Sequence, residues 1–339
     1  MELRPLGRTG VQVSKLCLGA MMFGDWGNKD HDDSIRIIHR ALDAGINFID
    51  TADVYSAGES EEIVGKALAG GKRDNVVLAT KLVMPMGDDP NQRGTSRRWI
   101  FQEVENSLRR LGTDWIDLYQ VHRIDPQTDI EETLSALSDL VHQGKVRYLG
   151  HSTYPPSLIV EAQWVARDRR LQRFVSEQPP YSLLTRGIEA DVLPTCARYG
   201  MAVISWSPLQ GGWLSGRWSA DATPTSPARQ RLTTRYDMSL PANQRKLEVV
   251  EQLSRVADEA GISLVEMAIA FVLNHPAVTA PIVGPRTMEQ FEGQLAAAEV
   301  VLDDAVLDRI DEIVPPGVNL NPADGGWSHP GMEPAARRR

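Results

Sequence analysis

The segment INFIDTADVYSAGESEEIVGKALAGGKRDNVVLATK (46–81) decides the fold. It opens with the apolar run INFID (46–50), continues with the helix-like stretch SEEIVGKALAGG (60–71), and closes with a second apolar run, NVVLATK (75–81). Short apolar runs bounded by turn residues predict buried strands, and a helix between two of them predicts that the strands are parallel. One strand–helix–strand unit is therefore expected here.

The same alternation extends in both directions along the chain. The predicted strands span residues 15–20, 46–50, 75–81, 115–122, 146–152, 173–178, 201–207 and 279–284. The predicted helices span residues 32–45, 60–71, 96–112, 128–144, 157–168, 188–200 and 287–299. Either a (β/α)8 TIM barrel or a doubly wound sheet accepts such a series. No two glycines stand two positions apart, so the GxGxxG fingerprint of the doubly wound sheet is absent, which favours the barrel.

Several segments fall outside the alternation. Residues 2–13 predict an N-terminal hairpin, and residues 208–245, rich in Gly, Ser, Thr, Pro and Arg, predict a long lid loop. Extra helices are expected at 246–275 and 303–314. We therefore expect one barrel domain over residues 1–314, followed by a Pro/Gly-rich C-terminal tail, 315–339, that is extended or partly disordered.

The composition predicts an ordinary water-soluble protein. The 339 residues include 36 Lys and Arg against 45 Asp and Glu, a net charge of −9 that argues against binding to nucleic acid or anionic membranes. No apolar stretch is long enough to span a membrane, and the N-terminus lacks a signal-peptide pattern. The two cysteines form no CxxC pair, so a cytoplasmic location is expected, and a homo-oligomer is left open.

Polar residues end the predicted strands, where a parallel barrel forms its site. The last residues of the apolar runs are Gly19, Asp50, Lys81, His122, Ser152, Gln178, Trp206 with Ser207, and Gly284. Strands two, three and four thus bring a carboxylate, an ammonium and an imidazole to one mouth, and Tyr55 follows Asp50 in the loop above it. Each charged residue alone could form a structural ion pair, but charged side chains are rarely buried without a purpose.

These four residue types suit the transfer of a proton to a carbonyl oxygen. A phenol is a poor acid at neutral pH, and a nearby ammonium should lower its pKa. A carboxylate would keep the ammonium charged, and an imidazole could orient the carbonyl. The set holds no activated nucleophile, and the seven histidines lack metal-ligand spacing, so no metal is predicted. Asp50, Tyr55, Lys81 and His122 are therefore the candidate catalytic residues.

Six stretches together resemble the aldo-keto reductase superfamily. They are NFIDTADVY (47–55), TK (80–81), QVH (120–122), SEQPPYSLL (176–184), ISWSPLQGGWLSGR (204–217) and IVGPRTMEQFEGQL (282–295). Because Trp206 stands in the SPL motif, the chain most resembles the bacterial reductases related to potassium-channel β-subunits. The resemblance implies a (β/α)8 barrel that uses NADPH/NADP+ without a Rossmann domain, with Asp50, Tyr55, Lys81 and His122 as its tetrad.

The resemblance also implies the cofactor contacts. They are Gly19, Ala20, Met21, Asp50, Ser152, Thr153, Gln178, Trp206, Ser207, Pro208, Leu209, Gly211, Arg217, Gly284, Arg286, Gln290 and Gln294. Thr153 replaces a commoner Asn or Arg, and Gln294 stands where the family has Asn. Helix geometry independently supports the expected contacts around Gly284 and Arg286. The stretch GPRT (284–287) opens a predicted helix, and the free N–H groups at a helix start suit a phosphate. Arg286 could hold a 2′-phosphate, which favours NADPH, whereas Gln290 could instead cap the helix.

Charged and apolar residues surround the expected mouth. Positive charge in the lid comes from Arg217, Arg229, Arg231 and Arg235, at least two of which are expected to be plain surface residues. The candidate substrate walls are Trp26, Met84 and Trp213, with Met86 and Trp327 more distant candidates, and packing is the alternative role for each.

The expected activity is NADPH-dependent reduction of small aldehydes or ketones, with Tyr55 as proton donor. An NADPH-sensing regulatory subunit with little turnover is the first alternative. A hydrolase or isomerase that uses Asp50 and Lys81 without a cofactor is the second. The physiological substrate is not encoded in any motif.

Overall fold

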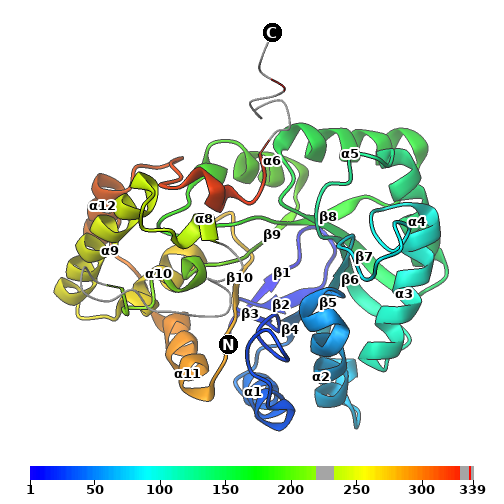
Figure 1. The fold of residues 1–339 in the computed structure, drawn as a ribbon, viewed down its shortest axis with the longest axis horizontal. Helices are drawn as coiled ribbons and strands as arrows, with labels where there is room; N and C mark the ends of the chain where they lie inside the picture. Colours follow the sequence, from blue (N-terminus) through cyan, green and yellow to red (C-terminus); the bar gives the residue numbers. More distant parts are fainter. Residues whose placement is uncertain (219–232, 329–335, 337–339) are drawn as a thin grey trace.

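Eight parallel strands close into a barrel in the computed structural model, which describes residues 1–218, 233–328 and 336 (Figure 1). The strands follow one another around the barrel in chain order, with the last pairing to the first. They are β3 (Cys17–Gly19), β4 (Phe48–Asp50), β5 (Val77–Leu82), β6 (Ile116–Val121), β7 (Val146–Ser152), β8 (Phe174–Gln178), β9 (Ala202–Ser205) and β10 (Ala280–Val283). The predicted (β/α)8 TIM barrel is confirmed.

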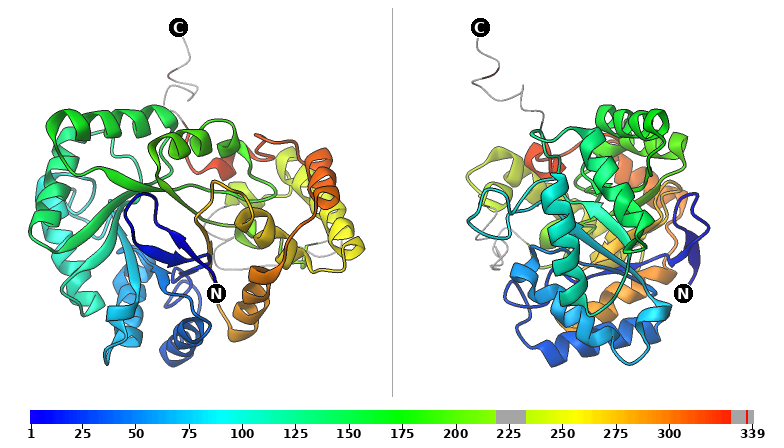
Figure 2. Two further views of the ribbon diagram at one scale, coloured as in Figure 1. Left: turned by 180° about the vertical axis from the view of Figure 1, so that it is seen from behind. Right: turned by 90° about the vertical axis from the view of Figure 1, so that its right-hand side faces the viewer.

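Helices surround the barrel and cover the outer face of its strands (Figures 1 and 2). They are α1 (His31–Asp43), α2 (Glu59–Leu68), α3 (Arg97–Leu111), α4 (Ile130–His142), α5 (Pro156–Arg169), α6 (Val192–Tyr199), α8 (Thr233–Tyr236), α9 (Pro241–Glu259), α10 (Leu264–Leu273), α11 (Met288–Ala296) and α12 (Asp304–Ile313). The helix α3 shows how local sequence sets these bounds. The Ser96 side chain caps its first turn, and Gly112, in the left-handed conformation, ends it.

A two-stranded hairpin closes one end of the barrel. Strand β1 (Leu3–Pro5) pairs antiparallel with β2 (Gln12–Ser14), as predicted for residues 2–13. Its buried Leu6 and Val13 join the small apolar cluster inside the barrel, which also includes Cys17. Figures 1 and 2 show the hairpin lying across the barrel end opposite the carboxyl ends of the strands. A functional site is therefore expected at the other end of the barrel, where the parallel strands end.

Two predicted boundaries after β9 are wrong. The lid was expected to reach residue 245, but α9 already begins at Pro241, because proline is favoured in the first turn of a helix. The expected single helix over 246–275 is two helices. Gly261, with φ +71°, ends the first, and a capping box between Ser263 and Glu266 starts the second. Residues 219–232 of the expected lid, including Arg229 and Arg231, lie outside the described residues.

The first part of the C-terminal tail is folded, contrary to the expectation of an extended segment. A 3-10 turn spans Pro322–Gly325, and its Asp324 is buried. The Asp324 carboxylate accepts a hydrogen bond from Lys246 Nζ at 2.9 Å, and Asn321 donates one to Asn243 at 2.8 Å. The fold of this segment could not be predicted from its many prolines and glycines. The buried polar contacts that hold it come from α9, which lies far away along the chain.

Candidate active site

The carboxyl ends of three neighbouring strands bring the predicted catalytic residues together. Asp50 is the last residue of β4, Lys81 is the penultimate residue of β5, and His122 follows β6 directly. Tyr55 opens the short turn Tyr55–Gly58, which follows β4. Because β4, β5 and β6 are consecutive in the barrel, these side chains lie at one mouth.

Lys81 lies at the centre of the four residues. Its Nζ donates to Asp50 Oδ2 at 2.5 Å, to the backbone oxygen of Thr51 at 2.8 Å, and to the Tyr55 hydroxyl at 3.3 Å. The Tyr55 ring meets the His122 ring edge-on, with their centroids 5.7 Å apart. Lys81 thus contacts both Asp50 and Tyr55, Tyr55 in turn lies against His122, and Lys81 has no exposed surface.

Two glutamines that hold Asp50 complete this centre. Gln120 Nε2 and Gln178 Nε2 both donate to Asp50 Oδ1, at 3.0 Å and 2.9 Å, and Gln178 also donates to Gln120 Oε1 at 3.1 Å. Gln178 is also an expected cofactor contact, which stays a prediction; its amide nitrogen takes part in this network. Gln120 was missed. Its position could have indicated this role. Gln120 stands two residues before His122, and side chains two positions apart along a strand lie on the same face.

The charges at the centre set the protonation states of Lys81 and Tyr55. Burial by itself lowers the pKa of Lys81, but attraction to Asp50 and the hydrogen bond to Tyr55 outweigh it, so this pKa is raised. For Tyr55, burial raises the pKa more than the Lys81 ammonium lowers it. The expectation that the Tyr55 pKa lies below its ordinary value is therefore wrong. Lys81 reduces the effect of burial without reversing it.

His122 is held as a neutral imidazole. Burial lowers its pKa well below the usual value, and the positive charges of Lys81 and Arg123 lower it further. Its backbone N–H donates to Leu82 O at 3.0 Å, while its buried Nδ1 has no hydrogen-bond partner in the part of the chain that the structure describes. A neutral ring carries one donor and one acceptor nitrogen, which suits it to hold a carbonyl oxygen.

The turn that carries Tyr55 has an unusual backbone. Ser56 and Ala57 have φ of 49° and 56°, a region that costs free energy for residues other than glycine. Gly58 follows, with φ +98°, and a side chain there would lie 2.7 Å from Cδ of Arg110. Arg110 is itself anchored by the buried carboxylates of Glu61 and Glu103, at 2.6 and 2.5 Å. A buried ion-pair network around Arg110 therefore packs against the turn that carries Tyr55.

Trp206 lies at the mouth, as expected for a residue that stacks on a nicotinamide. The guanidinium carbons of Arg123 and Arg235 lie 5.8 and 5.5 Å from its ring centre. A side chain on Gly326 would lie 2.9 Å from the Trp206 ring and 3.1 Å from Thr153 Cγ2, so the C-terminal segment packs directly on this ring. Sequence reasoning placed no C-terminal residue other than Trp327 near the mouth.

The loop after Trp206 has an unusual backbone. Ser207, Gln210, Gly211 and Gly212 have φ of 62°, 49°, 61° and 97°. Hydrogen bonds within the loop hold this shape: Gln210 N–H donates to Ser207 O at 2.8 Å, and Gly212 N–H donates to Leu209 O at 2.9 Å. Arg217 is exposed beyond this loop, and Pro208 is buried. The exposed guanidinium of Arg217 suits a pyrophosphate, which keeps this loop a candidate for the predicted pyrophosphate contacts.

The start of α11 fits an adenosine phosphate. Thr287 caps the helix, and Gly284 leaves the space above it open. Arg286 is half-buried, and its backbone N–H donates to Gln290 Oε1 at 2.9 Å, so Gln290 serves the helix end. The buried Gln294 Oε1 has no partner among the described residues. An unpartnered buried amide oxygen suits a hydrogen bond from an amino group such as that of adenine, which NADH and NADPH share.

The remaining predicted contacts divide between mouth and core. Gly19 is tightly packed, because a side chain there would lie 2.5 Å from Ile282, whereas Met21 is exposed. The Trp26 ring lies 5.9 Å from that of Tyr55, which places it beside the site. Trp213 is buried and stacks on Trp218, so it packs in the core rather than lining the mouth. The other residues lie as follows: Ala20, Ser152 and Thr153 are buried, and Met84, Met86 and Trp327 are half-buried.

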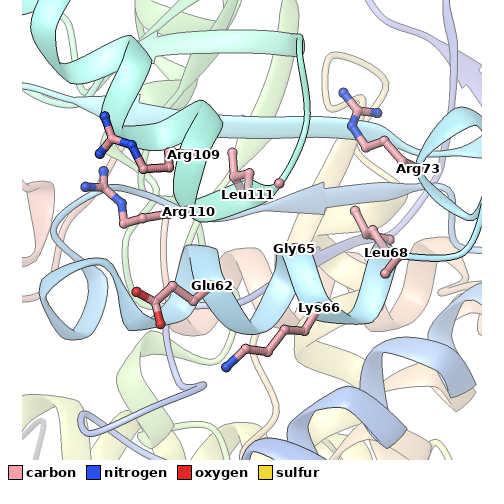
Figure 3. Close-up of a pocket in the computed structure, with 10 residues that line it drawn as sticks. Glu62, Gly65, Lys66, Leu68, Arg73, Arg109, Arg110 and Leu111 are labelled. Carbon is pink, nitrogen blue, oxygen red and sulfur yellow. The ribbon is translucent and has the colours of Figure 1, made fainter.

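A cavity of about 440 Å³ lies outside the barrel, between α2 and α3 (Figure 3). Lys66 and Glu62 line it from α2, and Arg109 and Arg110 from α3. It is remote from the strand ends and holds none of the four candidate catalytic residues.

Within the described ranges, no group of three or more His, Cys, Asp or Glu side chains is placed to hold a metal ion. None of the helices described is long and apolar enough to cross a membrane.

Comparison with known proteins agrees with the barrel fold. The profile described as the Aldo/keto reductase family matches residues 15–315. The chain is 41% identical over 337 residues to the Bacillus subtilis "Uncharacterized oxidoreductase YrpG", covering 96% of this chain and 100% of that protein. It is 35% identical to a rice "Probable voltage-gated potassium channel subunit beta", covering 93% and 97% of the two chains. It is 34% identical to the "Versiconal hemiacetal acetate reductase" of Aspergillus parasiticus, covering 92% and 96%.

The fold and the family define the class of this protein as an NAD(P)-dependent oxidoreductase acting on small carbonyl substrates. The chain belongs to the aldo/keto reductase family. The relatives therefore confirm the resemblance drawn from the sequence motifs, including the similarity to potassium-channel β-subunits.

Proposed function

We propose that this protein reduces aldehydes and ketones to alcohols with NADPH, and that Tyr55 donates the proton. One observation carries the proposal: Lys81 Nζ lies 3.3 Å from the Tyr55 hydroxyl while also bonding Asp50. A buried ammonium beside a phenol favours the phenolate that remains after proton transfer. No other role accounts as directly for this buried chain of acid, amine and phenol.

Each residue has a distinct task in the proposed reaction. His122, held neutral, orients the carbonyl oxygen toward Tyr55 by a hydrogen bond. Tyr55 gives its hydroxyl proton to that oxygen as the C=O bond becomes C–OH, and Lys81 stabilises the phenolate that is left. Asp50, fixed by Gln120 and Gln178, keeps Lys81 charged and in position. When bound, the reduced nicotinamide supplies the hydride that the carbonyl carbon accepts.

The cofactor is proposed to lie across the mouth from Trp206 to α11. Trp206 would stack on the nicotinamide, the loop Ser207–Arg217 would receive the pyrophosphate, and Gln294 would bond the adenine. Arg286, half-buried beside the start of α11, would hold the 2′-phosphate. Guanidinium binding to that phosphate is the reason to propose NADPH in preference to NADH.

A cofactor titration followed by a panel of aldehydes tests this function. We expect NADPH to quench the intrinsic fluorescence of the protein and aldehydes to consume the absorbance of the reduced nicotinamide. Tight NADPH binding with no turnover on any carbonyl would favour a nucleotide-sensing subunit. No NADPH binding at all would favour a hydrolase or isomerase built on Asp50 and Lys81.

A further inference from the structure

Arg123 lies beside the proposed catalytic residues and has no assigned role. Its Nη1 donates to the backbone oxygen of His122 at 2.7 Å, and to Ser152 Oγ and Thr153 Oγ1 at 3.3 Å each. Its guanidinium carbon is 5.8 Å from the centre of the Trp206 ring. These contacts fix the guanidinium at the mouth, beside the catalytic imidazole.

No described carboxylate pairs with this guanidinium. Two other arginines that make several hydrogen bonds do have acidic partners: Arg110 binds Glu61 and Glu103, and Arg186 binds Glu189 and Asp311. All the hydrogen bonds that Arg123 forms with described residues use Nη1, so within those ranges Nη2 and Nε have none. A guanidinium has five N–H donors, and most of those on Arg123 are unused.

The surroundings make this unpaired charge costly. Burial, the largest influence, lowers the pKa of Arg123; the nearby Arg235 adds to this effect, while Tyr55 and Glu177 partly oppose it. Arg235 also lies near the Trp206 ring, 5.5 Å from its centre, but it is paired with Asp324 at 3.6 Å. Arg123 is half-buried, and a partly buried charge without an acidic partner points to a ligand that neutralises it.

We propose that Arg123 determines substrate specificity by binding a negatively charged group, a carboxylate or a phosphate, carried by the carbonyl substrate. This inference rests on the proposed carbonyl reduction. A planar guanidinium with free N–H groups is suited to bidentate contact with such an anion. The cofactor phosphates are proposed to lie elsewhere, at the loop Ser207–Arg217 and at Arg286. The anion that reaches Arg123, next to His122, therefore belongs to the substrate.

Matched pairs of charged and uncharged aldehydes test the proposal. One pair is 4-carboxybenzaldehyde and its uncharged counterpart methyl 4-formylbenzoate. The other is glyceraldehyde 3-phosphate and glyceraldehyde, which separates a phosphate preference from a carboxylate preference. We expect the wild type to have the higher kcat/KM for the charged member of at least one pair. In Arg123→Gln, that preference should fall by about 30-fold or more, because one partner of a desolvated charge pair is gone.

Controls separate a charge effect from a structural one. Arg123→Lys, which keeps the charge, should retain part of the preference, and Arg309→Gln, on the far helix α12, should retain all of it. NADPH affinity, measured by fluorescence quenching, should change little in Arg123→Gln.

Three results would overturn the proposal while leaving carbonyl reduction in place. They are no preference for either charged aldehyde, an equal loss on both members of a pair in Arg123→Gln, and a loss confined to NADPH affinity. If wild type reduces none of the four aldehydes although it binds NADPH, carbonyl reduction and the role of Arg123 fail together.

Discussion

The Lys81 ammonium lies 3.3 Å from the Tyr55 hydroxyl and bonds the Asp50 carboxylate on its other side. Lys81 and Asp50 are buried and Tyr55 is half-buried at the barrel mouth, so screening of the Lys81 charge by water is reduced there. The charge on Lys81 therefore acts on Tyr55 with little attenuation. Its effect opposes the burial that raises the Tyr55 pKa.

Replacement of Lys81 by Met should separate these two influences. Without the ammonium, burial and Asp50 both disfavour the phenolate, so the pKa of Tyr55 should rise further. We expect turnover to fall on the order of 10²-fold and the basic limb of the pH–rate profile to move to higher pH. Circular dichroism and NADPH binding control for folding, since Asp50 loses its partner. An unchanged basic limb would show that Lys81 does not tune Tyr55.

Protonation of His122 should produce no acidic limb in the pH dependence of kcat/KM near the ordinary pKa of histidine. Because its pKa is well below about 6.5, the ring stays neutral as pH falls through that value, and kcat/KM should stay level there. The unfolded chain does take up a proton at His122 below about 6.5, so stability should decrease as pH falls below that point. His122→Asn should weaken this dependence in urea titrations. A kinetic limb near pH 6.5 that disappears in His122→Asn would contradict a neutral His122.

Gly326 tests whether the folded part of the tail shapes the cofactor site. Its φ is +75°, and an added Cβ would lie 2.9 Å from the Trp206 ring. Gly326→Ala should therefore both lower the melting temperature and weaken NADPH binding. Gly261→Ala is the matched control, because its φ is +71° and nothing lies near its Cβ. If the two variants bind NADPH equally well, the tail does not act on Trp206.

Arg286 should set the choice between the two nicotinamide cofactors. Loss of a guanidinium–phosphate contact should weaken NADPH binding on the order of 10- to 100-fold. NADH has no 2′-phosphate, so its affinity should change little in Arg286→Met. The measurement is the ratio of the two dissociation constants from fluorescence titrations, with Arg309→Met as control. An equal loss for both cofactors would assign Arg286 to the fold of α11 instead.

The sequence predicted the barrel because the repeated alternation of apolar runs and helical segments has only two architectural solutions. It also located Asp50, Lys81 and His122, because polar residues at the ends of buried strands must lie at one mouth of a parallel barrel. Local patterns were sufficient for both predictions. The loop position of Tyr55, five residues after Asp50, added it to this set, and the family motifs then extended the prediction to the cofactor residues.

What the sequence did not predict depends on contacts between distant segments. The tail around Asp324 is folded by Lys246, which no local pattern links to it. The direction of the Tyr55 pKa shift depends on the balance of burial against one charge, and motifs do not encode burial. Arg123 gave no signal, because a basic residue after a strand is common, and only the absence of a described acidic partner makes it notable.

The turnover of Tyr55→Phe tests the central claim most directly. The substitution removes one hydroxyl and leaves the ring beside Trp26 and His122. We expect kcat for aldehyde reduction to fall on the order of 10²- to 10⁴-fold while NADPH binds with its wild-type affinity. Near-normal turnover in this variant would contradict the assignment of Tyr55 as the proton donor.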